Sequence, residues 1–310
     1  MTNVAKTMDR QDWSLLIFLS VLWGGAYFFA GVAVQELPPL TVVLVRVSLA
    51  ALTLLPLFWY FGYSLPKTWA DWYPFIGMGL LNNVLPFGFI FAGQTQITVG
   101  LSSIINALTP LFTVVVMATA REERLTIYRL IGVLLGVVGV GILRGIDYPG
   151  AGAQTLGIAL CMAGALSYGF AALWGRRNLV GVPPLKSATC QLICSTFVMT
   201  VIVAFIDQPW ELNVPSQTTL LSLLALSFLG TALAYVVFFK ILVCAGASNV
   251  MLVTLLIPIT ALVLGNVFLS EPIRPNEIFG AAVIGLGLLF IDGRLIDRVR
   301  GRSRPDGPSL

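Results

Sequence analysis

The segment "ALTPLFTVVVMATAREERLT", from Ala107 to Thr126, carries a proline inside an apolar run that stops at a group of charges. A second segment, "LLIPITALVLGNVFLSEPIR" from Leu255 to Arg274, has the same arrangement. Residue pairs in and after these segments lie 148 positions apart: Pro110 and Pro258, Glu123 and Glu271, Gly132 and Gly280. The chain therefore contains an internal repeat, and each copy places a helix-breaking proline in its most apolar part.

The composition indicates a protein that lies largely in a membrane. Of 310 residues, 57% are hydrophobic and only 10% are charged, and the mean hydropathy is +0.92. Soluble domains carry about a quarter charged residues. Ten runs approach the roughly 20 apolar residues that span a bilayer. They cover residues 13–33, 39–61, 72–92, 97–118, 126–144, 153–174, 185–206, 217–241, 246–269 and 275–292. We therefore predict an all-α polytopic membrane protein with ten transmembrane helices.

The distribution of lysine and arginine agrees with ten spans, because alternate connections are rich and poor in positive charge. Of the 18 basic residues, the poor side holds Arg144 and Arg274, and Arg46 lies inside the second run. All others fall on the side that holds both termini, which we therefore expect to be cytoplasmic. The net charge of +4 then reflects topology and anionic lipid, so nucleic acid is not an expected partner.

The repeat predicts an inverted architecture. Each half contains five spans, so the second copy enters the membrane from the opposite side. In the early part of each half the offset is 145 residues, which matches the Pro38–Pro39 pair with Pro183–Pro184 and Arg46 with Gln191. Such inverted repeats are the usual plan of secondary transporters. The expected organisation is an N-terminal segment 1–12, repeats at 13–144 and 153–292, an outer connection 145–152 and a basic tail 293–310.

Longer motifs resemble a known family. "WGGAYFFAGVAV" and "GLSSIINALTPLFTVVVMATAREERLTIYRLIGVLLGVVGVGIL" in the first half, and "GASNVMLVTLLIPITALVLGNVFLSEPIRPNEIFGAAVIGLGLLFI" in the second, resemble the EamA-type ten-helix branch of the drug/metabolite transporter superfamily. The resemblance implies a carrier of the bacterial inner membrane that exports small metabolites, as the aromatic amino-acid exporters do. It also implies functional positions at Arg46, Glu123 and Glu271. Gln191 departs from the arginine pattern in the second half.

Arg46 is the first candidate for substrate binding. A central arginine costs about 2.5–3.5 kcal/mol or more on insertion scales, so it needs a compensating partner. That partner is either an anionic group of the substrate or a structural contact with a neighbouring helix. Amides at membrane depth and deep aromatic rings are further candidates, with helix packing as the alternative. They are Trp23, Tyr27, Asn82, Phe87, Asn106, Tyr168, Trp174, Gln191 and Tyr235.

Two prolines and two sets of glycines have a mechanical interpretation. Pro110 and Pro258 are candidate hinges, because a proline frees backbone carbonyls and bends a helix. Glycines recur in the fifth and tenth runs, where small residues permit close helix approach. That contact is either internal or part of a homodimer, so we expect a monomer or a homodimer.

The missing residue types also constrain function. The chain has no histidine, and its four cysteines lie in apolar runs, so no metal, cofactor or disulfide framework is expected. No carboxylate lies deep in a predicted span, which favours facilitative transport over proton coupling. Intramembrane enzymes need paired aspartates or a Ser–His pair, so an enzyme is disfavoured. The leading prediction is export of neutral or aromatic amino acids, and the alternative is transport of a nucleotide sugar or sugar phosphate.

Overall fold

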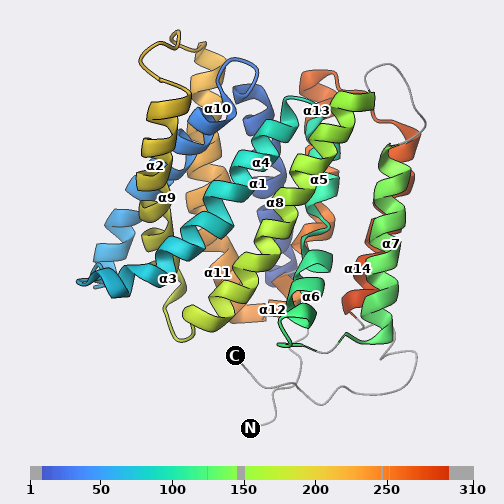
Figure 1. Ribbon diagram of the computed structural model, residues 1–310, viewed down its shortest axis with the longest axis horizontal. Coiled ribbons are helices and arrows are strands. Elements are labelled where there is room, and N and C mark those ends of the chain that lie inside the picture. The colour runs from blue at the N-terminus through green and yellow to red at the C-terminus, as the bar shows by residue number, and fades with distance from the viewer. Residues whose placement is uncertain (1–8, 124, 145–150, 246, 251, 293–310) are drawn as a thin grey trace.

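The protein is a helical bundle in a computed structural model, which describes residues 9–123, 125–144, 151–245, 247–250 and 252–292 (Figure 1). The first half comprises α1 (Arg10–Ala33), α2 (Pro39–Tyr60), α3 (Trp69–Gly79), the π-helical turn η1 (Leu80–Val84), α4 (Leu85–Gln94), α5 (Val99–Asn106), α6 (Thr109–Thr119) and α7 (Ile127–Arg144). The second comprises α8 (Ala151–Asn178), α9 (Pro184–Ile206), α10 (Gln217–Ser227), the π-helical turn η2 (Phe228–Leu233), α11 (Ala234–Ala245), α12 (Ala247–Val250), α13 (Val253–Leu269) and α14 (Pro275–Asp292). The described residues contain no strand, which confirms the all-α prediction.

The helices account for the ten predicted spans. Eight segments are long and apolar enough to cross a membrane, and two shorter apolar helices cover 253–269 and 275–291. The third and eighth spans each contain a π-helical turn, and the fourth and ninth are each divided into two helices. We call the side where α1 begins the N face and the side where α1 ends the opposite face.

Local sequence determines where the helices begin. Asp9 and Asp12 form a capping box that starts α1 before the apolar run. Thr68 and Asp71 do the same for α3. Pro38 and its equivalent Pro183 precede α2 and α9, whose first residues are also prolines, as expected where no intrahelical donor is needed. The two halves thus begin equivalent helices with equivalent signals.

Contacts between the halves show the inverted symmetry directly. Gly24 of α1 lies against Thr260 of α13, and its equivalent Gly169 of α8 lies against Phe112 of α6. Because Thr260 and Phe112 are also repeat equivalents, the two contacts are copies of each other. In both cases the absence of a side chain on the glycine lets the helices approach closely. The architecture of two inverted five-span repeats is therefore confirmed.

The fifth and tenth spans form a separate pair at one end of the bundle (Figure 1). A Cβ atom on Gly132 of α7 would lie 2.6 Å from the carbonyl oxygen of Gly287 on α14. A Cβ atom on Gly139 would lie 3.1 Å from the carbonyl oxygen of Gly280. The 148-residue offset relates Gly132 to Gly280 and Gly287 to Gly139. The repeat symmetry therefore maps the interface between α7 and α14 onto itself.

Candidate functional site

Arg46 lies in the third turn of α2, and only 8% of its surface is exposed. Its Nε donates a hydrogen bond of 3.0 Å to Oγ1 of Thr231 in η2. The guanidinium carbon lies 3.7 Å from the centroid of the Phe87 ring and 5.6 Å from that of Phe91, both on α4. A cation over an aromatic face gains electrostatic stabilisation, most of all when it is desolvated. One edge and one face of the guanidinium are therefore occupied by the protein.

The positive charge of Arg46 has no carboxylate partner among the described residues. The ionisable groups that interact with it electrostatically are the phenols of Tyr27, Tyr168 and Tyr235, from α1, α8 and α11. These three rings are half-buried and pack against the same apolar cluster as Phe87. A buried charge without a counter-ion is costly, and the part of the chain that the structure describes offers no hydrogen-bond acceptor to the Nη groups of Arg46.

Amide groups form a second part of the site. Nδ2 of Asn82 in η1 donates to Oε1 of Gln191 on α9 at 3.3 Å, and Asn82 also forms a side-chain hydrogen bond with Tyr235. The neighbouring Asn83 donates to the hydroxyl of Ser195 at 2.9 Å. Since Gln191 is the repeat equivalent of Arg46, both equivalents bind a π-helical turn of the other half. The resulting site is rich in hydrogen-bond donors and therefore suited to an anionic group.

The structure brings together seven of the candidates proposed from sequence and leaves three at its margin. The seven are Arg46, Tyr27, Asn82, Phe87, Tyr168, Gln191 and Tyr235. The ring centroids of Trp23 and Phe238 lie 5.5 Å apart, in an adjoining apolar cluster. Nε1 of Trp174 donates to the carbonyl of Pro74 at 2.9 Å, nearer the N face. Asn106 ends α5, and its buried Oδ1 accepts no hydrogen bond from any described residue.

Thr231 was not among those candidates. Its hydroxyl donates to the carbonyl of Leu226 at 3.1 Å while its oxygen accepts from Arg46. The repeat contains a signal that points to it, because Thr231 is the equivalent of Asn83, a polar residue at membrane depth. A single threonine in a long apolar run gives no such signal by itself.

The two candidate hinges differ in position. Pro110 lies in the first turn of α6, directly after the interruption at Ala107 and Leu108. Pro258 lies inside α13, which begins at Val253 after the end of α12 at Val250. In both spans the helix is interrupted before the proline. Of these two prolines, Pro258 is the one that removes a donor from the interior of a helix.

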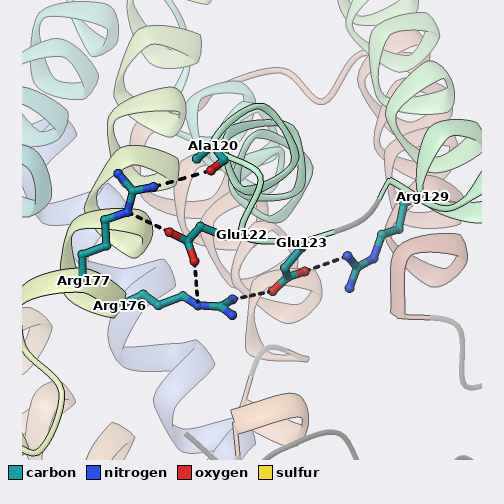
Figure 2. A network of polar contacts seen from close by, with 6 residues as sticks. All are labelled: Ala120, Glu122, Glu123, Arg129, Arg176 and Arg177. Carbon is teal, nitrogen blue, oxygen red and sulfur yellow. Dashed lines mark hydrogen bonds and ion pairs between the residues drawn. The ribbon is translucent and has the colours of Figure 1, made fainter.

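The repeated glutamates lie on different faces and have different partners. On the N face, Glu123 accepts from Arg129 at 2.6 Å and from Arg176 at 3.1 Å, in the network that Figure 2 shows. On the opposite face, both carboxylate oxygens of Glu271 lie 3.0 Å from the backbone nitrogen of Val99, the first residue of α5. Burial raises the pKa of Glu271, and backbone N–H groups of α5 partly offset that rise.

Two other carboxylates on the opposite face also bind helix starts in the other half. Oδ2 of Asp207, after α9, accepts from the backbone nitrogen of Thr41 at 2.8 Å and from its hydroxyl at 2.7 Å, in the first turn of α2. Glu36, after α1, accepts from the backbone nitrogen of Ser216 at 2.7 Å and from its hydroxyl at 2.6 Å, directly before α10. These bonds from Ser216 lower the pKa of Glu36.

Two inverted five-span halves with polar side chains buried between them have the plan of secondary membrane transporters. The profile of the EamA-like transporter family matches residues 12–145 and matches again at residues 155–292. This chain therefore belongs to the EamA-like transporter family, and each half carries one copy of the family's domain. The family assignment made from the sequence motifs is confirmed.

Curated relatives agree with this assignment, and a solved structure shares the fold. An uncharacterized transporter of Archaeoglobus fulgidus is 22% identical over 281 residues, which cover 91% of this chain and 98% of that protein. A probable amino-acid metabolite efflux pump of Salmonella typhimurium is 25% identical over 291 residues, which cover 91% and 94%. A crystal structure with 20% sequence identity aligns with a TM-score of 0.64 over 95% of this chain and 100% of that one, and it shows the shared fold.

Proposed function

We propose that this protein exports small carboxylate-bearing metabolites, neutral or aromatic amino acids above all, across the bacterial inner membrane by alternating access. The observation that carries the proposal is Arg46, whose buried charge has no carboxylate partner among the described residues. A substrate carboxylate would supply the missing anion, and two parallel hydrogen bonds from the Nη groups would orient it. The name of the Salmonella typhimurium relative supports amino acids as the class of substrate.

The neighbours of Arg46 are suited to contact the side chain of such a substrate. Tyr27, Tyr168 and Tyr235 come from three different helices and combine apolar rings with polar hydroxyls. An amino acid with an apolar or aromatic side chain matches that surface. The described site contains one cation, which fits a single carboxylate better than the multiple charges of a sugar phosphate.

The proposal includes transport down the substrate gradient. In the described helices, carboxylates occur only in first or last turns. Proton-coupled carriers usually keep a titratable carboxylate within the membrane. We therefore expect no uphill accumulation when only a pH gradient is imposed on vesicles. Uphill accumulation under that gradient would contradict the facilitative mode and leave the substrate class standing.

Uptake into vesicles that contain the purified protein tests the substrate class. Labelled phenylalanine and leucine should enter saturably, whereas phenylalaninamide, which lacks the carboxylate, should not compete. Arg46→Gln should reduce uptake by about ten-fold or more, because hydrogen bonds to charged groups are the strong ones. Arg177→Gln, a change at an exposed arginine on the N face, is the matched control and should transport normally. Equal uptake by Arg46→Gln and wild type would remove Arg46 from the binding site.

A further inference from the structure

We propose that Thr231 is a positioning residue that fixes the orientation of Arg46 and so determines which edge of the guanidinium meets the substrate. The inference rests on the proposed role of Arg46 in carboxylate binding. Thr231 Oγ1 accepts from Nε at 3.0 Å and donates to the carbonyl of Leu226 at 3.1 Å. Since the hydroxyl proton is used in the second bond, the oxygen faces Arg46 as an acceptor.

The contacts that Thr231 and Phe87 make with Arg46 leave one edge of the guanidinium available to a substrate. Thr231 occupies Nε, and the ring of Phe87 covers one face at 3.7 Å. The remaining planar edge, formed by the two Nη groups, is the one that binds a carboxylate with two parallel hydrogen bonds. Thr231 is fully within the bundle, with 2% of its surface exposed, so it acts through Arg46 and does not contact the substrate. The bond also joins α2 of the first half to η2 of the second.

The first test needs no substrate. In protein labelled with ¹⁵N at arginine, the Nε–H signal of Arg46 is identified by its loss in Arg46→Lys. Thr231→Val, which keeps the shape and loses the hydroxyl, should raise the exchange rate of this proton by about ten-fold. Thr231→Ser should restore protection. Thr196→Val is the matched control, because the Thr196 hydroxyl only donates to the carbonyl of Leu192 in its own helix. Unchanged exchange in Thr231→Val would overturn the proposal.

The second test uses transport and separates this proposal from the proposed function. Thr231→Val should raise KM several-fold with a smaller change in kcat, and Thr231→Ser should behave as wild type. In an Arg46→Lys background, Thr231→Val should add nothing, because the residue acts through Arg46. An additive effect there would overturn the positioning role. If wild type carries no amino acid, the proposed function fails, while proton exchange still decides the role of Thr231.

A second inference stands on the carboxylates of the opposite face. We infer that Glu36, Asp207 and Glu271 bias the transporter toward the conformation in which the opposite face is closed. Each one joins the halves by binding backbone N–H at or next to a helix start. In an inverted repeat, closure of the N face would use the equivalent positions. The repeat equivalent of Glu36 is Gly181. Asp207 follows α9, whereas Phe61 and Gly62 follow the equivalent helix α2. Of the three carboxylates, only Glu271 therefore has a carboxylate, Glu123, at its equivalent position.

Helix packing agrees with this bias. On the opposite-face side, α4 packs extensively on α8, whereas the equivalent pair on the N-face side, α11 and α1, packs less. Likewise α5 packs along α13 near Glu271, while α12 and α6, the equivalent pair, lack a comparable contact within the described part of the chain. Negative groups at helix N-termini are stabilising. Closure of the opposite face uses three such carboxylates, whereas closure of the N face could use only Glu123. The state with the opposite face closed should therefore have the lower free energy.

Distance measurements between spin labels test the bias. Labels at Thr95 and Val214 report on the opposite face, and labels at Tyr60 and Val180 report on the N face, in protein whose native cysteines are replaced by alanine. Glu36→Ala, Asp207→Ala and Glu271→Ala together should lengthen the first distance and shorten the second. Asp71→Ala is the matched control, because Asp71 caps α3 within its own half.

Two outcomes decide this inference. A shift of both distances in the triple variant, with wild-type distances in Asp71→Ala, supports it. Unchanged distances on both faces would overturn it. If the triple variant does not fold, the three single variants are measured, and each should then produce part of the shift.

Discussion

Arg176 bridges two glutamates on the N face: its Nη1 lies 3.1 Å from Oε1 of Glu123, and its Nε lies 3.7 Å from Oε2 of Glu122. Arg129 binds the other oxygen of Glu123, and Arg177 binds Glu122 at 2.8 Å, so α8 and α7 are both tied to the connection after α6 (Figure 2). The side chains in this network remain a quarter to a half exposed. It is therefore accessible to salt.

Arg176→Gln should lower thermal stability slightly, and the loss should depend on salt. Partly exposed ion pairs contribute about 0.2–1 kcal/mol each, and the Debye length falls to about 3 Å at 1 M salt. The unfolding midpoints of Arg176→Gln and wild type should thus differ at low salt and converge at 1 M. A difference that persists in high salt would show that Arg176 acts through packing.

Glu271 should make stability depend on pH. Its pKa in the folded protein is raised by burial above the ordinary value of 4.5. A raised pKa means that the folded state holds the proton more tightly than the unfolded state. The stabilisation is complete below 4.5 and is lost as the pH rises through the raised value. Relative to Glu271→Gln, the wild-type unfolding midpoint should fall across that interval. A constant difference between the two proteins would contradict this.

Gly132→Ala should destabilise the pair formed by α7 and α14. The added Cβ would meet the backbone oxygen of Gly287, which a rotamer change cannot move, and overpacking costs about 1–3 kcal/mol. Gly141→Ala in the same helix is the control, because nothing lies within 4 Å of its Cβ position. That variant should unfold at the same temperature or higher, since alanine favours helix by about 1 kcal/mol. Equal midpoints for both variants would argue against close packing at Gly132.

Pro258→Ala should slow transport more than Pro110→Ala. Pro258 lies inside α13 and has no N–H to donate to the carbonyl four residues earlier, so alanine would complete that turn and stiffen the helix. Pro110 lies in the first turn of α6, where a missing N–H changes little. We expect a several-fold lower kcat with unchanged KM for Pro258→Ala. Equal kcat values for both variants and wild type would assign the prolines to packing.

The ten spans and their inverted repeat were predictable because lipid leaves the backbone few alternatives. Every N–H must be satisfied internally, so a long apolar run becomes a helix. The ends were less predictable: α1 begins at Arg10 because of the capping box at Asp9 and Asp12, which precedes the apolar run. The interruptions within spans depend on packing between helices, and hydropathy does not report it. Pro86, in the first turn of α4, favours a widened turn at η1, but its equivalent after η2 is Ala234 in α11.

The sequence predicts which types of residue form the candidate site better than it predicts which individual residues belong to it. Polar and charged side chains in apolar runs must face protein, which explains why Arg46, Asn82 and Gln191 converge. Trp174 shows the limit of this argument, because its indole N–H is used by the carbonyl of Pro74. Thr231 shows the converse, since a threonine in an apolar run gives no signal by itself; its repeat relation to Asn83 and its contact with Arg46 distinguish it.

The glycine interface between α7 and α14 has one further consequence. Because the inverted symmetry maps Gly132–Gly287 onto Gly280–Gly139, the interface looks the same from either side of the membrane. In the alternating-access mechanism proposed above, a contact such as that of Gly24 with Thr260 would be exchanged for its repeat equivalent, whereas the contact between α7 and α14 would be exchanged for itself. The fifth and tenth spans would then stay fixed relative to each other while the other helices move. Substitutions at their interface should therefore change stability and leave substrate selectivity unchanged.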